Sequence, residues 1–223
     1  MLECVVAKSR DPFLTALHEI RERAQTGTYA PGEQIVIIEE ARRLGLSTTP
    51  VREALSWLCG EGLVERSPTG GFLALRLDAG AVRDFYGVRL ICLLAGLELT
   101  AGLPAFGRRP AATDDPRPEL SRLFDTLVRR AGNGVLLAAY ARAAGPLRQV
   151  EAVEAAVFPD AAAEAGGLLE VAATEANGPL REALTRYHAR RHAAAGLLSL
   201  AVGRRAGRGP GAGEGMPPEG EQP

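Results

Sequence analysis

The chain has 223 residues, of which 46% are hydrophobic and 24% are charged, a balance that suits one large domain or two small ones. Its net charge of −1 argues against a non-specific nucleic-acid binder, because binding to phosphates usually leaves a basic footprint. No apolar stretch approaches the length of a membrane span, and the opening segment MLECVVAKSR lacks the basic start and long apolar core of an export signal. We therefore expect a cytoplasmic protein without a membrane partner.

The first predicted element is a helix from Asp11 to Arg23. Four apolar residues recur on one of its faces: Phe13, Leu14, Leu17 and Ile20. The segment from Thr26 to Gly32 holds two glycines and a proline in close order, which is typical of a turn. A brief extended segment is expected from Gln34 to Ile37.

Two short helices meeting at a sharp turn are predicted next. The first has apolar residues at roughly helical spacing (Ile37, Ile38, Ala41 and Leu44) and ends at Gly45, the residue best able to take a left-handed cap. Ser47 or Thr48 can cap the second helix, with Pro50 tolerated in its first turn. The second helix has a buried stripe of Val51, Ala54, Leu55 and Leu58, which leaves Thr49 and Arg52 on or near the other face.

This arrangement is how a helix-turn-helix is built, and in that motif the second helix enters the major groove of DNA. Thr49 and Arg52 would then reach base edges and phosphates. The first 75 residues are not basic as a whole, with eight basic and ten acidic side chains, but Arg42, Arg43 and Arg52 fall within the two motif helices. An ordinary antiparallel helix pair in an all-α domain is the alternative.

A β-hairpin is predicted after the second helix. Two short apolar runs, Leu63 to Arg66 and Gly71 to Leu75, are separated by the turn sequence SPTGG. This hairpin would form a wing, where Gly70 and Gly71 let the backbone approach DNA. Alternatively, the hairpin only covers the helical core.

The string LGLSTTPVREAL, followed by EGLV and then GG, closely resembles the winged helix-turn-helix of the GntR family of bacterial transcription regulators. The resemblance runs from about Asp11 to Leu75. Together with the helix-turn-helix reading it gives the candidate DNA-binding residues Arg43, Ser47, Thr48, Thr49, Arg52, Gly70 and Gly71. Thr48 stands where the family commonly has an arginine, so we expect a different operator sequence.

Only helices are expected after a junction at Asp78 to Gly80. They are predicted at residues 81–103, 119–130, 135–158 (with a possible break at Gly145-Pro146), 161–174 and 179–202, and a Pro-rich loop is expected at 104–118. The predicted fold is therefore mostly α. It has a winged helix-turn-helix with a small β-hairpin at residues 1–77, an all-helical bundle at 81–202 and a disordered tail at 203–223.

The second half resembles the all-helical ligand-binding (FCD) domain of FadR-like GntR regulators, through DFYGVRL, LFDTLVRRAGN and the late YHARRH. That resemblance implies a divalent metal held by an aspartate and three histidines. Here the corresponding positions have Ser121, a displaced Asp125, Ala165 and one matching histidine, His188. These are too few ligands for a stable site, so we expect no metal and no cofactor. Cys4, Cys59 and Cys92 also lack metal-ligand or disulfide spacing.

The same resemblance implies an organic-acid effector near Arg89, whose guanidinium suits a carboxylate. The candidate effector-binding residues are Arg89, Asp125 and His188. A snorkelling surface arginine is the alternative for Arg89, and effector binding could be weakened, altered or lost.

The sequence thus predicts a DNA-binding transcription regulator, by family analogy a repressor, that acts as a homodimer on double-stranded palindromic operator DNA. It does not predict an enzyme. Two alternatives remain open: a metal-dependent hydrolase built on His188, His192 and Asp125, and a winged helix that acts as a protein-interaction module.

Overall fold

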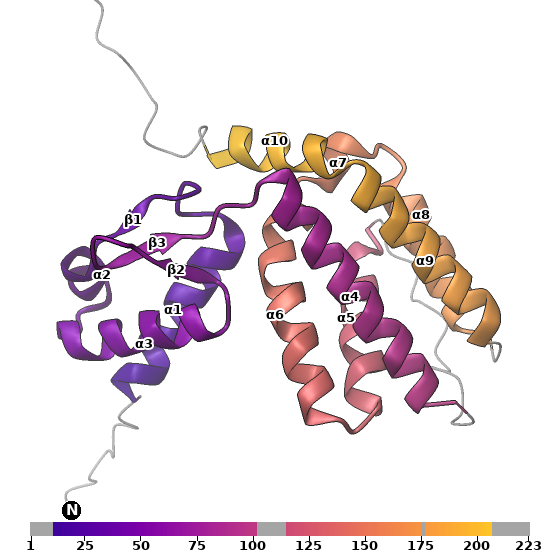
Figure 1. Ribbon diagram of the computed structural model, residues 1–223, viewed down its shortest axis with the longest axis horizontal. Helices are drawn as coiled ribbons and strands as arrows, with labels where there is room; N and C mark the ends of the chain where they lie inside the picture. Colours follow the sequence, from indigo (N-terminus) through magenta and orange to yellow (C-terminus); the bar gives the residue numbers. More distant parts are fainter. Residues whose placement is uncertain (1–10, 102–114, 175–176, 207–223) are drawn as a thin grey trace, which may run out of the picture.

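The computed structural model describes residues 11–101, 115–174 and 177–206, which form an amino-terminal domain and a larger helical domain (Figure 1). The predicted fold class is confirmed: helices dominate, and the strands that the structure describes are confined to the amino-terminal domain. Within these ranges, no helix combines the length and the apolar character needed to cross a lipid bilayer.

Three helices form the body of the amino-terminal domain: α1 (Pro12–Thr26), α2 (Ile37–Leu44) and α3 (Thr48–Gly60). Asp11 caps α1 by accepting a hydrogen bond from the Phe13 amide at 2.9 Å, and Gly27 ends this helix in the left-handed conformation. The predicted stripe of α3 is confirmed, since Val51, Ala54, Leu55 and Leu58 are completely buried. They pack against α1 through Ala16, Leu17 and Ile20.

A small antiparallel sheet closes the domain, with β1 (Gln34–Ile35), β2 (Val64–Arg66) and β3 (Phe72–Ala74) in the order β1-β3-β2. Val64 pairs with Ala74 and Arg66 with Phe72, so the predicted hairpin is confirmed. The extended segment before α2 adds the third strand, because Ile35 pairs with Phe72 across the sheet.

Two apolar residues of the predicted helix faces lie outside the core. Leu14 is 57% exposed and Ile38 is 62% exposed, although both belong to the apolar sets from which the helices were predicted. The reason is that α1 turns the face carrying Ala16 and Ile20 toward α3, and the small Ala16 side chain permits close packing there. Likewise α2 turns Ala41 inward rather than Ile38.

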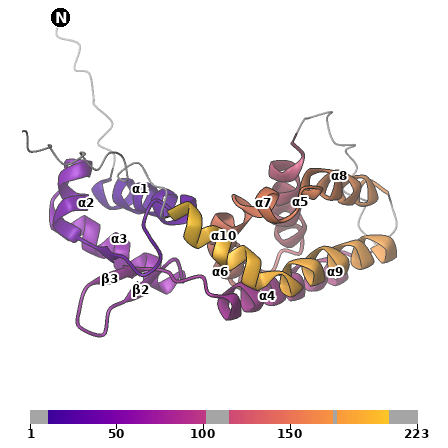
Figure 2. The same ribbon diagram turned by 90° about the horizontal axis from the view of Figure 1, so that it is seen from above.

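The helical domain comprises α4 (Ala79–Leu99), α5 (Arg117–Arg130), α6 (Gly134–Glu151), α7 (Glu154–Val157), α8 (Ala161–Ala172), α9 (Asn177–Ala193) and α10 (Ala195–Ala206). The long helix α4 is central and packs against α5, α6, α9 and α10. Figure 2, seen from above, shows α9 running alongside α4. Asp78 caps α4 by accepting from the Ala81 amide at 2.8 Å, so the helix starts within the predicted junction.

The helix ends differ from the prediction in three places. Helix α6 continues through Pro146, because a proline lacks one hydrogen-bond donor but still fixes φ at a helical value. The helix ends at Glu151, before the predicted end at residue 158. The predicted helix at 179–202 is two helices, α9 and α10, which are separated at Ala194. Helix α10 continues to Ala206, four residues past the predicted boundary, and the rest of the predicted tail lies outside the described residues, as does most of the predicted 104–118 loop.

The two domains meet where α1 lies against α6, on the side of the bundle that faces the amino-terminal domain (Figure 1). The Gln149 side chain donates a hydrogen bond to the Ala24 carbonyl at 2.6 Å. Gly145 lies against Leu63 and Gln25 of the amino-terminal domain, and a Cβ at this position would come within 3.1 Å of the Leu63 side chain. The contact is small and mixed in polarity, which is typical of domains that can move relative to each other.

Candidate nucleic-acid interface and helical-domain site

The outward face of α3 is the first candidate site. Ser47, Thr48, Thr49 and Arg52 are all exposed, while the opposite face of the helix is buried. Ser47 precedes the helix in an extended conformation and its hydroxyl makes no capping bond. The first amides of α3 and the positive end of its dipole therefore face outward together with these hydroxyl groups, an arrangement that favours a phosphate oxygen.

Gly45 fixes the angle between α2 and α3. Its φ is +66°, and the amide of Leu46 donates to the Ala41 carbonyl at 2.9 Å, which closes the end of α2. An L-residue with a side chain rarely adopts this conformation, so glycine suits the turn. The turn leads directly into Ser47 and thus sets how far the start of α3 projects.

Arg43 is exposed, but its charge already has partners. Its guanidinium forms ion pairs with Glu40 at 3.0 Å and with Glu19 at 3.4 Å. The adjacent Arg42 is exposed and forms no ion pair with any residue that the structure describes. Arg42 is therefore the freer cation on α2, although the sequence prediction selected Arg43.

The hairpin places Gly70 and Gly71 at an exposed tip. Both have positive φ, +98° and +85°, and the Ser67 amide donates to the Gly71 carbonyl at 3.1 Å. Arg66, at the end of β2 beside the turn, donates to the Ser56 hydroxyl of α3 at 3.4 Å and lies over the Phe72 ring at 5.4 Å. Arg66 thus joins the hairpin to the outward side of α3, a link that sequence reasoning missed.

In the helical domain, Arg89 lies in the interior rather than on the surface. Only 1% of it is exposed, which excludes the snorkelling alternative. Its guanidinium forms an ion pair with Glu151 and donates from Nε to His188 Nε2 at 3.1 Å. Burial alone would lower the pKa of Arg89, but Glu151 raises it, and the net direction is upward.

His188 is held as a neutral ring. Its Nδ1 lies 2.8 Å from the Leu184 carbonyl, and its Nε2 receives the Arg89 donor, so a ring with its proton on Nδ1 satisfies both contacts. Burial, followed by the Arg89 charge, lowers the pKa of His188 well below its usual value. Both ring nitrogens are therefore occupied within the protein.

Asp125 does not join Arg89 and His188 in one hydrogen-bonded group. It accepts a hydrogen bond from the Tyr140 hydroxyl at 2.8 Å, and it lines a cleft between the two domains. The predicted effector set is thus divided between a buried pair and a separate, partly exposed carboxylate.

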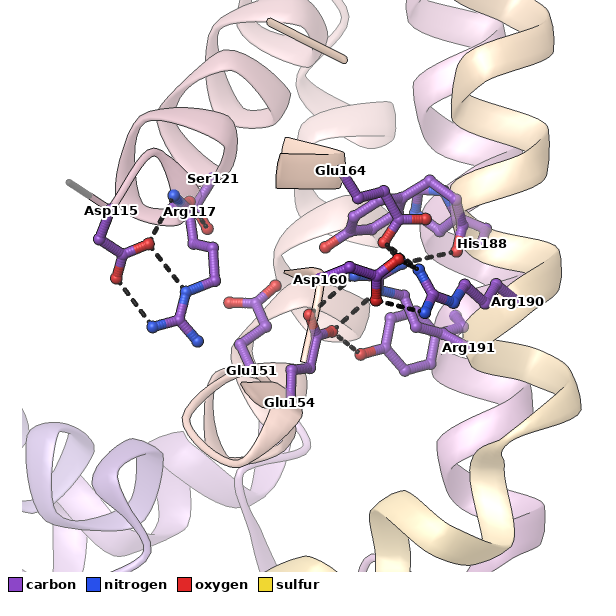
Figure 3. A network of polar contacts seen from close by, with 12 residues as sticks. Asp115, Arg117, Ser121, Glu151, Glu154, Asp160, Glu164, His188, Arg190 and Arg191 are labelled. Atoms are coloured by element: carbon purple, nitrogen blue, oxygen red, sulfur yellow. Dashed lines mark hydrogen bonds and ion pairs between the residues drawn. The ribbon is translucent and has the colours of Figure 1, made fainter. Parts of the chain in front are cut away.

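A second buried network surrounds Arg191, which the sequence analysis did not select. Arg191 pairs with Glu154 at 3.0 Å and with Glu164 at 2.7 Å, and Glu154 also accepts from the Tyr86 hydroxyl at 2.6 Å. Figure 3 shows Glu154 and Glu164 converging on Arg191, with Arg190 reaching Asp160 beside them. These contacts tie α7 and α8 to α9. Removing one partner of such a buried pair typically costs about 3–5 kcal/mol.

Within the described residues, no group of three or more His, Cys, Asp or Glu side chains could hold a metal ion. His188 is buried and its neighbour on the helix, His192, is exposed, so the two do not share a cation-binding face. The chemistry of these residues does not fit a metal-dependent hydrolase.

Comparison with known proteins bears on the amino-terminal domain. Residues 14–73 match the model of the family described as bacterial regulatory proteins, gntR family. This part of the chain is therefore similar to the GntR family. The match spans α1 to the hairpin, and it includes the whole exposed face of α3.

Relatives with this GntR-type domain are named as regulators. A stretch of 75 residues is 39% identical to an HTH-type transcriptional regulator of Agrobacterium vitis and covers 34% of this chain and 44% of that protein. A stretch of 110 residues is 36% identical to the Nta operon transcriptional regulator of Aminobacter aminovorans and covers 49% of this chain and 47% of that protein. The matched part is thus less than half the length of these relatives.

Solved structures resemble both domains. E. coli McbR/YncC matches with a TM-score of 0.58 and 17% identity, covering 83% of this chain and 97% of that one. A chain described as a transcriptional regulator GntR from Rhodococcus sp. RHA1 matches with a TM-score of 0.62 and 14% identity, covering 82% and 96%. At this identity the likeness shows the fold, a GntR-type domain followed by a helical domain.

Proposed function

We propose that this protein is a transcription regulator that binds operator DNA through the outward face of α3. The observation that carries the proposal is the exposure of Thr48, Thr49 and Arg52 at the start of a helix whose other face is completely buried. A helix presented in this way fits the major groove, where a guanidinium can pair with a guanine and hydroxyl groups can contact phosphates.

The hairpin supports the same direction of approach. Arg66 links β2 to Ser56 of α3, so the exposed Gly70-Gly71 tip is held beside the recognition helix. Because neither glycine has a side chain, the backbone at this tip can come close to a phosphate backbone or a minor groove. Arg42, rather than the ion-paired Arg43, supplies the free charge on α2.

We further propose a homodimer that binds a two-fold symmetric operator. One recognition helix contacts only a few base pairs, so such domains gain affinity by binding two half-sites at once. Helix α4 carries an unpartnered apolar stripe on its outer face, with Val88 43%, Ile91 67% and Leu99 56% exposed. These positions are three and eight residues apart, so they share one face of the helix. A second copy of this chain is the proposed partner of this α4 stripe.

Repression is the proposed outcome, because a dimer seated on an operator blocks access to the DNA beneath it. We also propose that the helical domain is of the FCD type. Its effector would be an organic acid that acts through Arg89, Asp125 and His188. Binding of a carboxylate at Arg89 would have to displace the tethered carboxylate of Glu151. Such an effector therefore competes with an internal ion pair.

The experiment is selection of DNA fragments from a random pool, followed by gel-shift titration with the enriched sequence. Arg52→Ala should weaken binding by about tenfold to a hundredfold, the equivalent of losing a base contact worth roughly 1–3 kcal/mol. Arg186→Ala, which removes an exposed arginine of α9, is the matched control and should bind as the parent does. Equal affinities for the parent and Arg52→Ala would refute the assignment of α3.

A further inference from the structure

A cleft of about 720 Å³ lies between the two domains, and neither Arg89 nor His188 lines it. One wall comes from α1 and α3 of the GntR-type domain, and the other from α5 and α6 of the helical domain. Small-molecule sites commonly have volumes of roughly 300–1,000 Å³ and are frequent at domain interfaces. The dimensions therefore suit a small ligand, whereas a DNA duplex would not enter a hollow of this volume.

The helical-domain wall is positively charged, and one of its arginines, Arg148, lies near enough to the Glu151 carboxylate to oppose the rise in pKa that burial gives that group. Arg129, Arg142 and Arg148 all line the cleft and are exposed, and none of them forms an ion pair with a described residue. This distinguishes them from Arg89, Arg190 and Arg191, whose charges are paired with carboxylates within the protein.

The opposite wall is aromatic and held in place. The Trp57 indole donates from Nε1 to Glu61 at 2.8 Å, and Arg21 binds the same carboxylate through both of its oxygens at 2.7 and 2.8 Å. Phe13 packs edge-on against the Trp57 ring, with centroids 6.1 Å apart. Trp57 is 57% exposed even so. A planar indole is thus fixed beside the cleft with much of its surface uncovered.

The remainder of the lining is largely apolar, with Leu63 at the domain contact and Leu137, Ala141 and Ala144 along α6. The cleft carries four arginines and two carboxylates, Glu61 and Asp125, and these carboxylates already accept bonds from Arg21 and Tyr140. The cleft therefore has a largely apolar lining with one aromatic wall, and its arginines outnumber its carboxylates.

We propose that this cleft binds an amphipathic organic anion, with an aromatic or aliphatic body against Trp57 and Leu137 and a carboxylate held by Arg142 and Arg148. A guanidinium binds a carboxylate through two parallel hydrogen bonds, and an arginine free of ion pairs does so without breaking an existing one. The ligand touches both domains at once. It therefore favours the domain arrangement in which both walls are in place, and it can shift the positions of the two recognition helices in a dimer.

The single tryptophan of the chain makes binding measurable at the site itself. In a ¹H–¹⁵N spectrum of the full chain, Trp57 gives one indole resonance, which is followed during titration with 2-naphthoate and, in parallel, with the neutral 2-naphthalenemethanol. The expected result is a saturable shift with 2-naphthoate and binding of the alcohol at least about tenfold weaker, because it lacks the charge-assisted hydrogen bonds. No shift, or equal affinity for the two compounds, would overturn the proposal.

Two kinds of variant test the walls. Arg142→Gln combined with Arg148→Gln should reduce 2-naphthoate affinity at least about tenfold, whereas Arg122→Gln, an exposed arginine on α5 outside the cleft, should leave it unchanged. Ala141→Phe should block the cleft by volume while leaving all the arginines in place. Unchanged binding in either variant, with the parent's melting temperature retained, would contradict the site.

The effect on DNA rests on the proposed function and is measured separately. Saturating 2-naphthoate should change gel-shift affinity for the selected operator in the parent chain and leave it unchanged in Ala141→Phe. Binding without any change in operator affinity would overturn the regulatory role but not the site. Failure of the chain to select DNA would count against the proposed function alone, because the Trp57 titration needs no DNA.

Discussion

Arg89 and His188 show how the interior of the helical domain keeps a charged side chain. The Arg89 guanidinium has Glu151 as its counterion and His188 as a neutral acceptor, and its Cζ lies 4.9 Å from the centre of the Tyr86 ring. Among the described residues, the Arg89 Nη2 group is buried and has no hydrogen-bond partner. The contact therefore favours an unprotonated His188, since a cationic ring would face the guanidinium directly.

This arrangement predicts a pH dependence of stability. The folded-state pKa of His188 lies well below 6.5, so the unfolded chain binds more protons than the folded chain once the pH drops through 6.5. Unfolding therefore becomes easier as the pH falls. Between pH 7.5 and 5.5 the His188 contribution should be a loss of about 1 kcal/mol of unfolding free energy, measured by denaturant titration at fixed protein concentration.

The control is His188→Gln, which keeps a side-chain oxygen that can accept from Arg89 but does not titrate. Burial raises the pKa of Glu151 from its usual 4.5, which favours the folded state as the pH falls toward that value. This contribution is present in both the parent and His188→Gln. The difference between the two pH profiles isolates the histidine. Parallel profiles would show that His188 does not titrate differently on unfolding.

The same residues mark the limit of what the sequence could predict. Helical periodicity predicted the buried stripe of α3 and the exposure of Arg52 correctly, because both depend on one local repeat. It could not find the partner of Arg89, since Glu151 is 62 residues away and the contact depends on how α4 packs against α6. The separation of Asp125 from His188 is likewise a result of packing between helices.

At the scale of elements, the α2–α3 turn depends on one backbone conformation. Gly45 has a φ of +66°, and a Cβ at this position would meet no atom within 4 Å. Gly45→Ala therefore tests backbone strain alone, without any steric clash. We expect a loss of about 1 kcal/mol of unfolding free energy, measured by denaturant titration.

Gly167→Ala is the matched control for this substitution. Gly167 lies within α8 with an ordinary helical backbone, and a Cβ there would also meet nothing within 4 Å. The same added methyl group should stabilise the protein by about 0.5–1 kcal/mol, because alanine loses less backbone freedom in a helix. If both variants changed stability in the same direction, the turn would not be under the backbone constraint described.

Helix ends were harder to predict than helices. Glycine and proline are local signals, yet Gly145-Pro146 does not break α6, and Ala194 separates α9 from α10 without either residue at the break. The bend at Ala194 brings Ala195 and Leu198 into the core with Leu147 and Val150 of α6. Burial of this apolar surface, rather than a local breaking signal, is the physical reason for the change of direction.

At the scale of the whole molecule, helix α4 has an exposed apolar outer face and an inner face that packs within the bundle. Val88, Ile91 and Leu99 are exposed apolar residues on the outer face of the central helix, whereas its inner face packs against α5 and α6. A contiguous apolar surface on a soluble domain usually marks an interaction site. If a second copy covers it, Ile91→Asp places two carboxylates at the contact and removes apolar burial on both sides.

Ile91→Asp should therefore convert the proposed dimer to a monomer at micromolar concentration, as measured by sedimentation velocity, without changing the helix content seen by circular dichroism. Val135→Asp is the control, because Val135 is 82% exposed at the start of α6 and lies outside the stripe. Val135→Asp should sediment as the parent does.

In gel shifts, the Ile91→Asp monomer should lose affinity for a paired half-site operator but keep the weaker affinity for a single half-site, since its α3 face is untouched. A parent chain that is already monomeric, or an Ile91→Asp chain that remains dimeric, would place the dimer contact elsewhere on the molecule.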